Sequence, residues 1–322
     1  GKYLRVNSKM LLFDFLDRFV EEYSVNWNGN TEKSNKNRLK FVKDHFNNIS
    51  LNKINTYTMQ QEFNKISKKG YKKSYINIIK AFLSSAFKYA IKIMKILETN
   101  PLTDITINGK TSIKKRAFTI DELEELRNFL SVPKKRKYYH LFIVLLNTGA
   151  RVGEILALGW ENVDFENNKI SIEKSLYYDD GGHPHLNETP KNKYSIRDVY
   201  VNEETMNIFK EKLEIYKQNK KEFRNYFKDE GFVFSRNDGT LEKKACLDYF
   251  GKLIKRKVKI TSPIHSLRHT HISFLVEAGY NLKNIQERVG HNDLKTTLNI
   301  YTHVTNEQKK DLGVNLNFFT KK

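Results

Sequence analysis

Histidine, arginine and tyrosine side chains are concentrated between Pro263 and Thr305. His265, Arg268 and His269 are spaced at i, i+3 and i+4, so on a helix they share one face. The apolar residues of the same helix are expected to pack against a core on the opposite face: Leu267, Phe274 and Leu275. Two imidazoles and a guanidinium side by side indicate a site for an anion.

A second arginine, Arg151, follows a strongly apolar helix and begins a short one. Glu154 lies one helical turn later, where its carboxylate can hold the Arg151 guanidinium in a fixed rotamer. Arg151 and Arg268 could each fork onto the non-bridging oxygens of one phosphate, a geometry that lysine cannot copy. The two arginines therefore favour a phosphate as the anion.

Tyr301 closes the same stretch, ten residues after His291. A phenol has a pKa near ~10, so it needs a neighbouring base or cationic surroundings before it attacks anything. Two arginines and two histidines would provide both, and the set suits phosphoryl transfer. The leaving oxygen still needs a proton, for which the segment TPKNKYSIRDVYV offers three candidates: Lys191, Lys193 and Arg197.

The histidines of this stretch also invite a metal-site interpretation. Zinc and magnesium sites usually add thiolate or carboxylate ligands, and the nearby carboxylates show no ligand-like spacing with the histidines: Glu277, Glu287 and Asp293. The single cysteine, Cys246, excludes an internal disulfide and a cysteine-based zinc site. We predict no metal and no cofactor. The other histidines are expected to be structural or exposed: His269, His271 and His303.

Positive charge is concentrated in the first third of the chain. The 322 residues carry a formal net charge of +20; residues 1–116 hold 23 Lys and Arg against 9 Asp and Glu, and residues 117–322 hold 34 against 28. This distribution favours a polyanion held by the first part of the chain. A membrane is disfavoured, because the sequence has no 18-residue apolar run. Double-stranded DNA is the expected partner.

Residues 1–100 are expected to form an all-α domain, in which apolar residues at helical intervals alternate with Lys-rich outer faces. Its expected helices are 8–23 with Ser8 as cap, one starting near Thr31, 56–69, and 72–95 stopped by Asn100 and Pro101. An exposed basic linker is expected over 101–116. The side chains expected to bind DNA are Lys33, Lys36, Arg38, Lys40, Lys43, Lys72, Lys73, Lys110, Lys114, Lys115 and Arg116.

Residues 117–305 are expected to form an α+β domain with a small antiparallel sheet, so the predicted fold class is mainly α. Thr119 and Glu122 form a capping-box pattern at its start. Strands are expected at 169–175 and 196–201, joined by the polar segment 178–195, and helices at about 203–220 and 242–258.

Four segments resemble, in order and spacing, the tyrosine site-specific recombinases: TGARVGEIL, TPKNKYSIRDVYV, HSLRHTHISFLVEAG and VGHNDLKTTLNIYTHVT. The likeness is closest to integrases of conjugative transposons and temperate phages of Gram-positive bacteria. It covers 117–305, and residues 1–100 are similar in character to the family's helical core-binding domain. The combination is highly specific, whereas any one motif alone would be weak.

The resemblance implies a role for each matching residue. Arg151 and Arg268 match the two catalytic arginines on the scissile phosphate, and Glu154 matches the acidic residue that supports the first of them. His265 and His291 match residues that hydrogen-bond this phosphate and help to move protons. The hairpin lysine that protonates the leaving 5′ oxygen and the nucleophile that forms a 3′-phosphotyrosine are matched by Lys191 and Tyr301.

The resemblance further implies an enzyme that integrates and excises a mobile element by Holliday-junction strand exchange, without metal or ATP. It implies a tetramer at synapsis, with residues 306–322 either exchanged between protomers or packed on their own domain. An excisionase or a host DNA-bending protein is an expected accessory partner. With no visible signal peptide, the expected location is the bacterial cytoplasm, on the nucleoid. The alternatives are a type IB topoisomerase and a non-catalytic DNA-binding regulator of the same fold.

Overall fold

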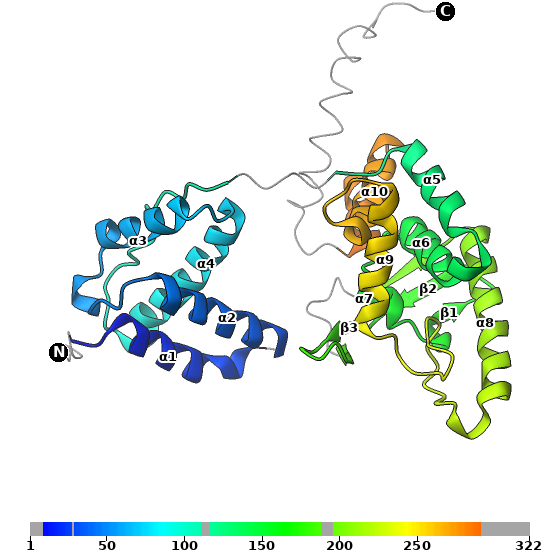
Figure 1. The fold of residues 1–322 in the computed structure, drawn as a ribbon, viewed down its shortest axis with the longest axis horizontal. Coiled ribbons are helices and arrows are strands. Elements are labelled where there is room, and N and C mark those ends of the chain that lie inside the picture. Colours follow the sequence, from blue (N-terminus) through cyan, green and yellow to red (C-terminus); the bar gives the residue numbers. More distant parts are fainter. Residues whose placement is uncertain (1–8, 28, 111–115, 188–195, 291–322) are drawn as a thin grey trace, which may run out of the picture. The chain divides into compact units, whose positions relative to one another are not determined.

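The computed structural model describes residues 9–27, 29–110, 116–187 and 196–290. The chain divides into two compact units, Gly1–Lys114 and Lys115–Lys322. Helices dominate both units and the strands belong to the second (Figure 1), so the predicted mainly α fold class is confirmed. None of the described helices is long and apolar enough to cross a membrane.

The described part of the first unit contains four α-helices: α1 Leu12–Tyr23, α2 Gly29–His45, α3 Thr56–Lys68 and α4 Lys73–Tyr89. Their apolar faces meet in one core, whose aromatic residues include Phe15, Phe19, Phe63 and Phe87. Each buried Phe of this kind contributes on the order of 1.5–3 kcal/mol relative to an exposed one. The core therefore fixes the helices, and their Lys-rich faces are left at the surface.

One predicted helix start and one predicted stop signal were wrong, although the fourth helix ends near residue 95 as expected. α1 begins at Leu12 with Leu11 as its N-cap, so Ser8 lies too far upstream to cap it. α4 continues as a π-helical turn, Ala90–Met94, and ends at Lys95, whose φ of 54° is left-handed. The helix therefore ends before Pro101 can restrict it.

Residues 101–110 pack into the first unit, which corrects the prediction of an exposed linker over 101–116. Three of their apolar side chains are at most 5% exposed and belong to the core of this unit: Leu102, Ile105 and Ile107. Lys110 pairs through its backbone with Lys72 at the start of α4. The apolar and polar residues alternate here as on a half-buried extended segment, a pattern too short to distinguish from a loop.

The described part of the second unit contains seven α-helices: α5 Ile120–Leu130, α6 Arg136–Thr148, α7 Val152–Leu156, α8 Glu203–Phe223, α9 Lys244–Lys257, α10 Pro263–Glu277 and α11 Leu282–Val289. The predicted capping box is present at the start of α5. Thr119 Oγ accepts a hydrogen bond from the Glu122 N–H at 3.2 Å, and the Glu122 carboxylate accepts one from the Thr119 N–H at 3.0 Å.

The strands form two separate antiparallel sheets. One has the order β1-β2-β5 and consists of Val163–Asp164, Lys169–Ile172 and Arg197–Tyr200. The other is a hairpin of β3, Ser175–Tyr178, and β4, Pro184–Asn187. The predicted pairing of the segments near 169 and 196 is confirmed. The hairpin was missed, because its second strand is short, begins with proline and lies in a segment predicted as a polar connection.

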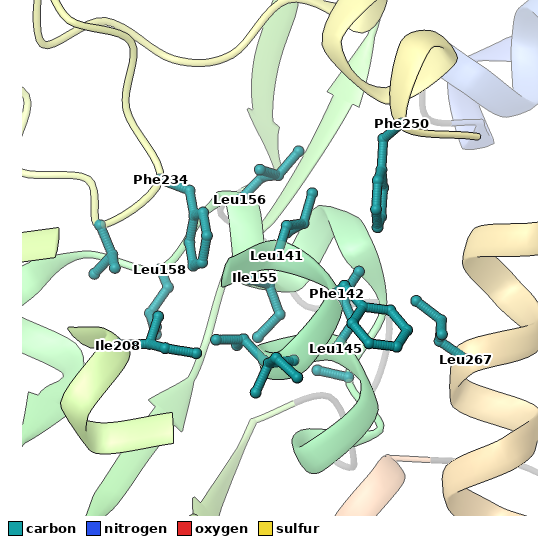
Figure 2. Packing of buried hydrophobic residues seen from close by; sticks show 14 of the residues in the cluster. Leu141, Phe142, Leu145, Ile155, Leu156, Leu158, Ile208, Phe234, Phe250 and Leu267 are labelled. Carbon is teal, nitrogen blue, oxygen red and sulfur yellow. The ribbon is translucent and has the colours of Figure 1, made fainter. Parts of the chain in front are cut away.

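The core of the second unit centres on α6, whose residues from Leu141 to Leu145 are all buried. Figure 2 shows Phe142 and Leu145 on the side of Leu267, which belongs to α10, with Ile155 of α7 beside them. The two elements that carry the candidate arginines, α7 and α10, are therefore anchored to one buried helix.

Candidate active site

Arg151 is the N-cap residue of α7, and Glu154 holds its side chain. Its Nη1 donates to Glu154 Oε1 at 2.8 Å, and its backbone N–H donates to Oε2 at 2.9 Å. The Glu154 side chain is 7% exposed, whereas that of Arg151 is 45% exposed. One edge of the guanidinium is thus fixed to a buried carboxylate while much of the group faces solvent.

Arg197 of β5 supports the same carboxylate. Its Nη2 donates to Glu154 Oε2 at 2.8 Å, and its Nε donates to the carbonyl oxygen of Arg288 at 2.7 Å. Burial alone would raise the pKa of Glu154, but the charges and hydrogen bonds of Arg197 and Arg151 outweigh it and hold the pKa below its ordinary value. Arg197 is therefore a support for Glu154, and its rival role as proton donor is not favoured.

Glycine is required at two positions, one in the turn between α6 and α7 and one in the first turn of α7. Gly149 has a φ of 64°, and a Cβ there would lie 2.3 Å from Cδ2 of His271. A Cβ on Gly153 would lie 2.5 Å from the carbonyl oxygen of Leu176 in β3. Any larger residue would force these elements apart. The glycines of the TGARVGE motif thus let the Arg151 turn approach α10 and β3 closely.

Arg268 is 3% exposed within α10 and is aimed at this turn. Its Nη1 donates to the Gly149 carbonyl oxygen at 2.9 Å, but its Nη2 is buried with no hydrogen-bond partner in the described structure. Burial and the charge of Arg151 lower the pKa of Arg268 to about 9, so it stays cationic at neutral pH. A buried cation with an unused donor is costly unless an anion completes it.

His265 and His269 share one face of α10, as predicted. Their ring centroids are 4.8 Å apart, and the rings are nearly perpendicular. Leu267 is fully buried, but Phe274 is 41% exposed, so the predicted apolar face is wrong at this position. The buried surface of α10 includes polar residues that the apolar spacing did not predict: Ser266, Arg268, Thr270 and His271.

His271 is a structural residue. Its Nδ1 lies 2.8 Å from the carbonyl oxygen of Leu146 and therefore carries the proton, while Nε2 accepts from Arg288 Nε at 3.1 Å. Burial and the charge of Arg288 lower the pKa of His271 to about 4, so the ring is neutral. Arg288 also donates to the carbonyl oxygens of Tyr200 and Asn147, each at 3.0 Å.

Arg288 thus joins α11 to the end of α6, to α10 and to β5, and its own carbonyl receives Arg197. Sequence reasoning did not single it out. Its acceptors include two backbone carbonyl oxygens, which have no signature in the sequence. Within the described ranges, no group of three or more His, Cys, Asp or Glu side chains could hold a metal ion.

Residues 116–308 match the phage integrase family. The chain belongs to this family. The integrase of Staphylococcus phage L54a is 30% identical over 327 residues, which cover 92% of this chain and 90% of that protein. The ICEBs1 integrase of Bacillus subtilis is 29% identical over 285 residues, which cover 85% and 73%. This integrase is accordingly a tyrosine recombinase, and the resemblance stated from its motifs is confirmed.

Two solved structures share the fold of this integrase. The Tn1549 transposon integrase in complex with transposon right end DNA has a TM-score of 0.79 at 23% identity, covering 94% of this chain and all of that one (100%). A lambda integrase tetramer bound to a Holliday junction has a TM-score of 0.66 at 15% identity, covering 99% and 82%. The tyrosine recombinase fold predicted from the sequence is therefore confirmed.

The structure brings three of the predicted site residues of the integrase together, Arg151, Glu154 and Arg268, and His265 lies on the same helix as Arg268. Three others lie outside the described residues: Lys191, His291 and Tyr301. Arg151 Nη2 lies 3.4 Å from the carbonyl oxygen of Gly290, the left-handed C-cap of α11. Gly290, the residue just before His291, therefore contacts the Arg151 guanidinium.

The predicted DNA-binding side chains of the integrase differ in their surroundings. Four are exposed and make no ion pair within the described residues: Lys40, Lys72, Lys73 and Lys110. Backbone pairing of Lys72 with Lys110 gathers the last three of these at the start of α4. Lys33 and Arg38 are partly buried, and Arg38 Nη1 donates to Asn35 Oδ1 at 2.7 Å.

Other predicted DNA-binding residues are already paired within the protein. Lys36 lies 2.5 Å from Glu32, and Lys43 lies 2.6 Å from Asp17. Arg116 donates from Nη1 and Nη2 to the two oxygens of Glu122, each at 2.6 Å. These two bonds fix the Arg116 side chain to the second unit. Lys114 and Lys115 lie outside the described residues.

Proposed function

We propose that this integrase cleaves and rejoins double-stranded DNA through a 3′-phosphotyrosine at Tyr301, in order to integrate and excise a mobile element. Arg151 and Arg268 bind the scissile phosphate, and His265 and His291 hydrogen-bond it. The observation that carries the proposal is the buried, unused Nη2 of Arg268 beside the partly exposed guanidinium of Arg151.

These two guanidinium groups suit a phosphate that gains negative charge in the transition state. Arg268 is held by a backbone carbonyl and Arg151 by a buried carboxylate, so neither has to reorganise during the reaction. Each group can donate from two nitrogens to phosphate oxygens. Glu154 contributes by keeping one Arg151 rotamer, and Arg197 and Arg288 contribute by keeping Glu154 in place.

The proposed reaction exchanges one ester bond for another. The Tyr301 hydroxyl gives its proton to His265 or His291 as its oxygen attacks phosphorus, the bond from phosphorus to the 5′ oxygen breaks, and Lys191 gives that oxygen its proton. A 5′ hydroxyl of a second strand then returns a proton to Lys191 as it attacks the phosphotyrosine, and the released Tyr301 oxygen takes back its own proton from the histidine. The reaction needs no energy from nucleotide hydrolysis. Every phosphodiester bond that is broken is replaced by one phosphotyrosyl ester, and the phosphodiester is re-formed in the second step.

The first unit is proposed to hold the core recombination site. Its exposed lysines and its share of the net charge support this, and the Tn1549 and lambda integrases are bound to DNA in their solved structures. We further propose a tetramer at synapsis; residues 306–322, for which exchange between protomers and packing on their own domain both remain open, lie outside the described residues. An excisionase or host bending protein as accessory partner, and a cytoplasmic location on the nucleoid, belong to the same proposal.

A suicide DNA substrate in EDTA tests the mechanism. The wild type should form a covalent adduct on a denaturing gel, and Tyr301→Phe should reduce adduct formation by about 10⁴-fold or more, because the nucleophile is removed. DNA affinity in a gel-shift assay should be unchanged and serves as the folding control. An adduct of equal yield with Tyr301→Phe, or none with the wild type, would refute the assignment.

A further inference from the structure

A pocket of about 110 Å³ lies in the second unit between α6, α8 and residues 233–237. It is larger than the ~10–15 Å³ that one water needs and smaller than the ~300 Å³ of the smallest drug-sized sites. The four basic side chains that line it come from two helices: Arg136, Lys137, His140 and Lys212. The candidate active site is built instead on α7, α10 and β5.

Lys212 is the cation of this pocket that makes no ion pair within the described residues. It is 8% exposed, and its ammonium lies 5.2 Å from the centre of the Phe234 ring, one of the apolar side chains in Figure 2. The two carboxylates nearby are engaged by other cations. Glu211 accepts from Arg136 at 2.6 and 3.0 Å, and Glu242 is paired with Lys137.

Burial and the charge of Lys137 lower the pKa of Lys212 to about 8, so the ammonium is still predominantly cationic at neutral pH. A buried cation of this kind is uncommon unless it is paired, because it has lost its hydration without a compensating partner. Its three N–H donors point to an acceptor that is not part of the described protein.

His140 supplies a second unused donor. The side chain is 1% exposed, and neither ring nitrogen has a hydrogen-bond partner in the described structure. Its Nε2 lies 3.3 Å from a Glu211 oxygen without the geometry of a hydrogen bond. Burial lowers the pKa of His140 to about 4, so the ring is neutral and offers one N–H. Ser235 and Asn237 add polar groups to the wall of the pocket.

We propose that this pocket binds a small oxyanion, either inorganic phosphate or the phosphate group of a nucleotide. The ammonium of Lys212 pairs with the anion, and the ring N–H of His140 donates to one of its oxygens. An oxyanion fits better than a halide because its several acceptor atoms match donors that converge from two helices. Binding fixes α8 to α6 and stabilises the second unit.

Thermal unfolding of the full chain, titrated with phosphate at constant ionic strength, tests the proposal. At ten times its Kd, phosphate should raise the Tm of the second unit by about 3–6 °C. Lys212→Met should abolish this rise, whereas Lys210→Met, at an exposed site on the same helix, should keep it. Lys212→Met should also melt above the wild type when phosphate is absent, because an unpaired buried charge has been removed.

The rise in Tm caused by phosphate in this pocket must also be distinguished from any rise caused by phosphate that binds at the candidate active site. All variants are therefore compared in an Arg151→Gln background, where the response should persist. An equal rise with AMP would identify a nucleotide phosphate as a ligand, and a rise with phosphate alone would identify the free anion. Should Lys212→Met not fold, His140→Phe makes the same test and should weaken binding at least tenfold. An unaltered phosphate response in the folded variant would overturn the proposal.

Discussion

The basic residues of the first unit and the arginines of the second unit present positive charge in opposite ways. Exposed lysines of the first unit, such as Lys40 and Lys73, lie on helix surfaces. Arg268 and Arg197 of the second unit are buried and bonded to groups far away in the chain. Surface lysines attract DNA of any sequence at long range, whereas fixed guanidinium groups stabilise one arrangement of charge.

The energetic consequences differ in the same way. Exposed ion pairs such as Lys43 with Asp17 are worth about 0–1 kcal/mol, so a DNA phosphate can replace the carboxylate at little cost. Breaking the buried pair of Glu154 and Arg197 would leave an uncompensated charge, which costs about 3–5 kcal/mol. Substitutions in the first unit should therefore change DNA affinity, and substitutions around Glu154 should change catalysis and stability.

Arg197→Met is expected to have the largest effect on stability, combined with a large effect on cleavage. It leaves the Glu154 carboxylate without its buried partner, so the free energy of unfolding should fall by about 3–5 kcal/mol. Cleavage at saturating DNA should fall by roughly 10²-fold, because the Arg151 guanidinium is misplaced. Urea unfolding and single-turnover cleavage measure the two effects. Arg197→Lys should recover part of the cleavage rate, and a fall in DNA affinity at unchanged cleavage rate would contradict the positioning role.

Arg268→Lys is expected to follow. Lysine keeps the charge but loses the fork, so single-turnover cleavage should slow by about 10²–10³-fold, as for loss of one preorganised donor. DNA affinity should stay within about twofold of the wild type. Lys40→Ala is the matched variant in the first unit and should behave in the opposite manner. If both variants changed only DNA affinity, the proposed difference between affinity set by the first unit and cleavage rate set by the second would be refuted.

The pH dependence of stability should reside in the second unit. Because the pKa values of buried His140 and His271 are lowered to about 4, the unfolded chain binds protons first as pH falls below 6.5. Their contribution is complete above pH 6.5 and is lost as pH falls toward 4. Between pH 7.5 and 5 each histidine should remove about 2 kcal/mol. In His140→Phe the loss of unfolding free energy between pH 7.5 and 5 should be smaller by the contribution of one histidine. Urea unfolding at the two pH values measures this, and an unchanged pH dependence would refute the prediction.

The smallest effect is expected from the lysines of the first unit. Each exposed lysine that contacts a phosphate adds about 0.9 to the slope of log affinity against log salt. Combined substitution of Lys40, Lys72 and Lys73 by Ala should therefore reduce that slope by about 2–3 and leave cleavage of bound DNA unchanged. Arg116→Ala is the control, because Glu122 already occupies its guanidinium. Equal slopes for the triple variant and the wild type would exclude these lysines from the interface.

Local patterns in the sequence predicted much of the secondary structure. α3 follows its apolar spacing and begins with a capping box at Asn55, and α5 begins with the capping box predicted at Thr119. These features depend on residues three or four positions apart. The predictions failed where a distant element covered a short segment, as at Ile105 and Ile107, or where a helix buries polar side chains and leaves an apolar one exposed, as α10 does at Phe274.

The sequence by itself determined the excess positive charge of residues 1–116, the identities of the candidate catalytic residues, and the order of the motifs that place the chain among the phage integrases. Only the tertiary structure decided which groups hold those residues. Arg197 is 43 positions from Glu154, and Arg268 is 119 positions from Gly149. Gly149 and the partners of Arg288 at Tyr200 and Asn147 offer backbone carbonyl oxygens. Every residue has such an oxygen, so its role becomes visible only when folding brings the donor to it.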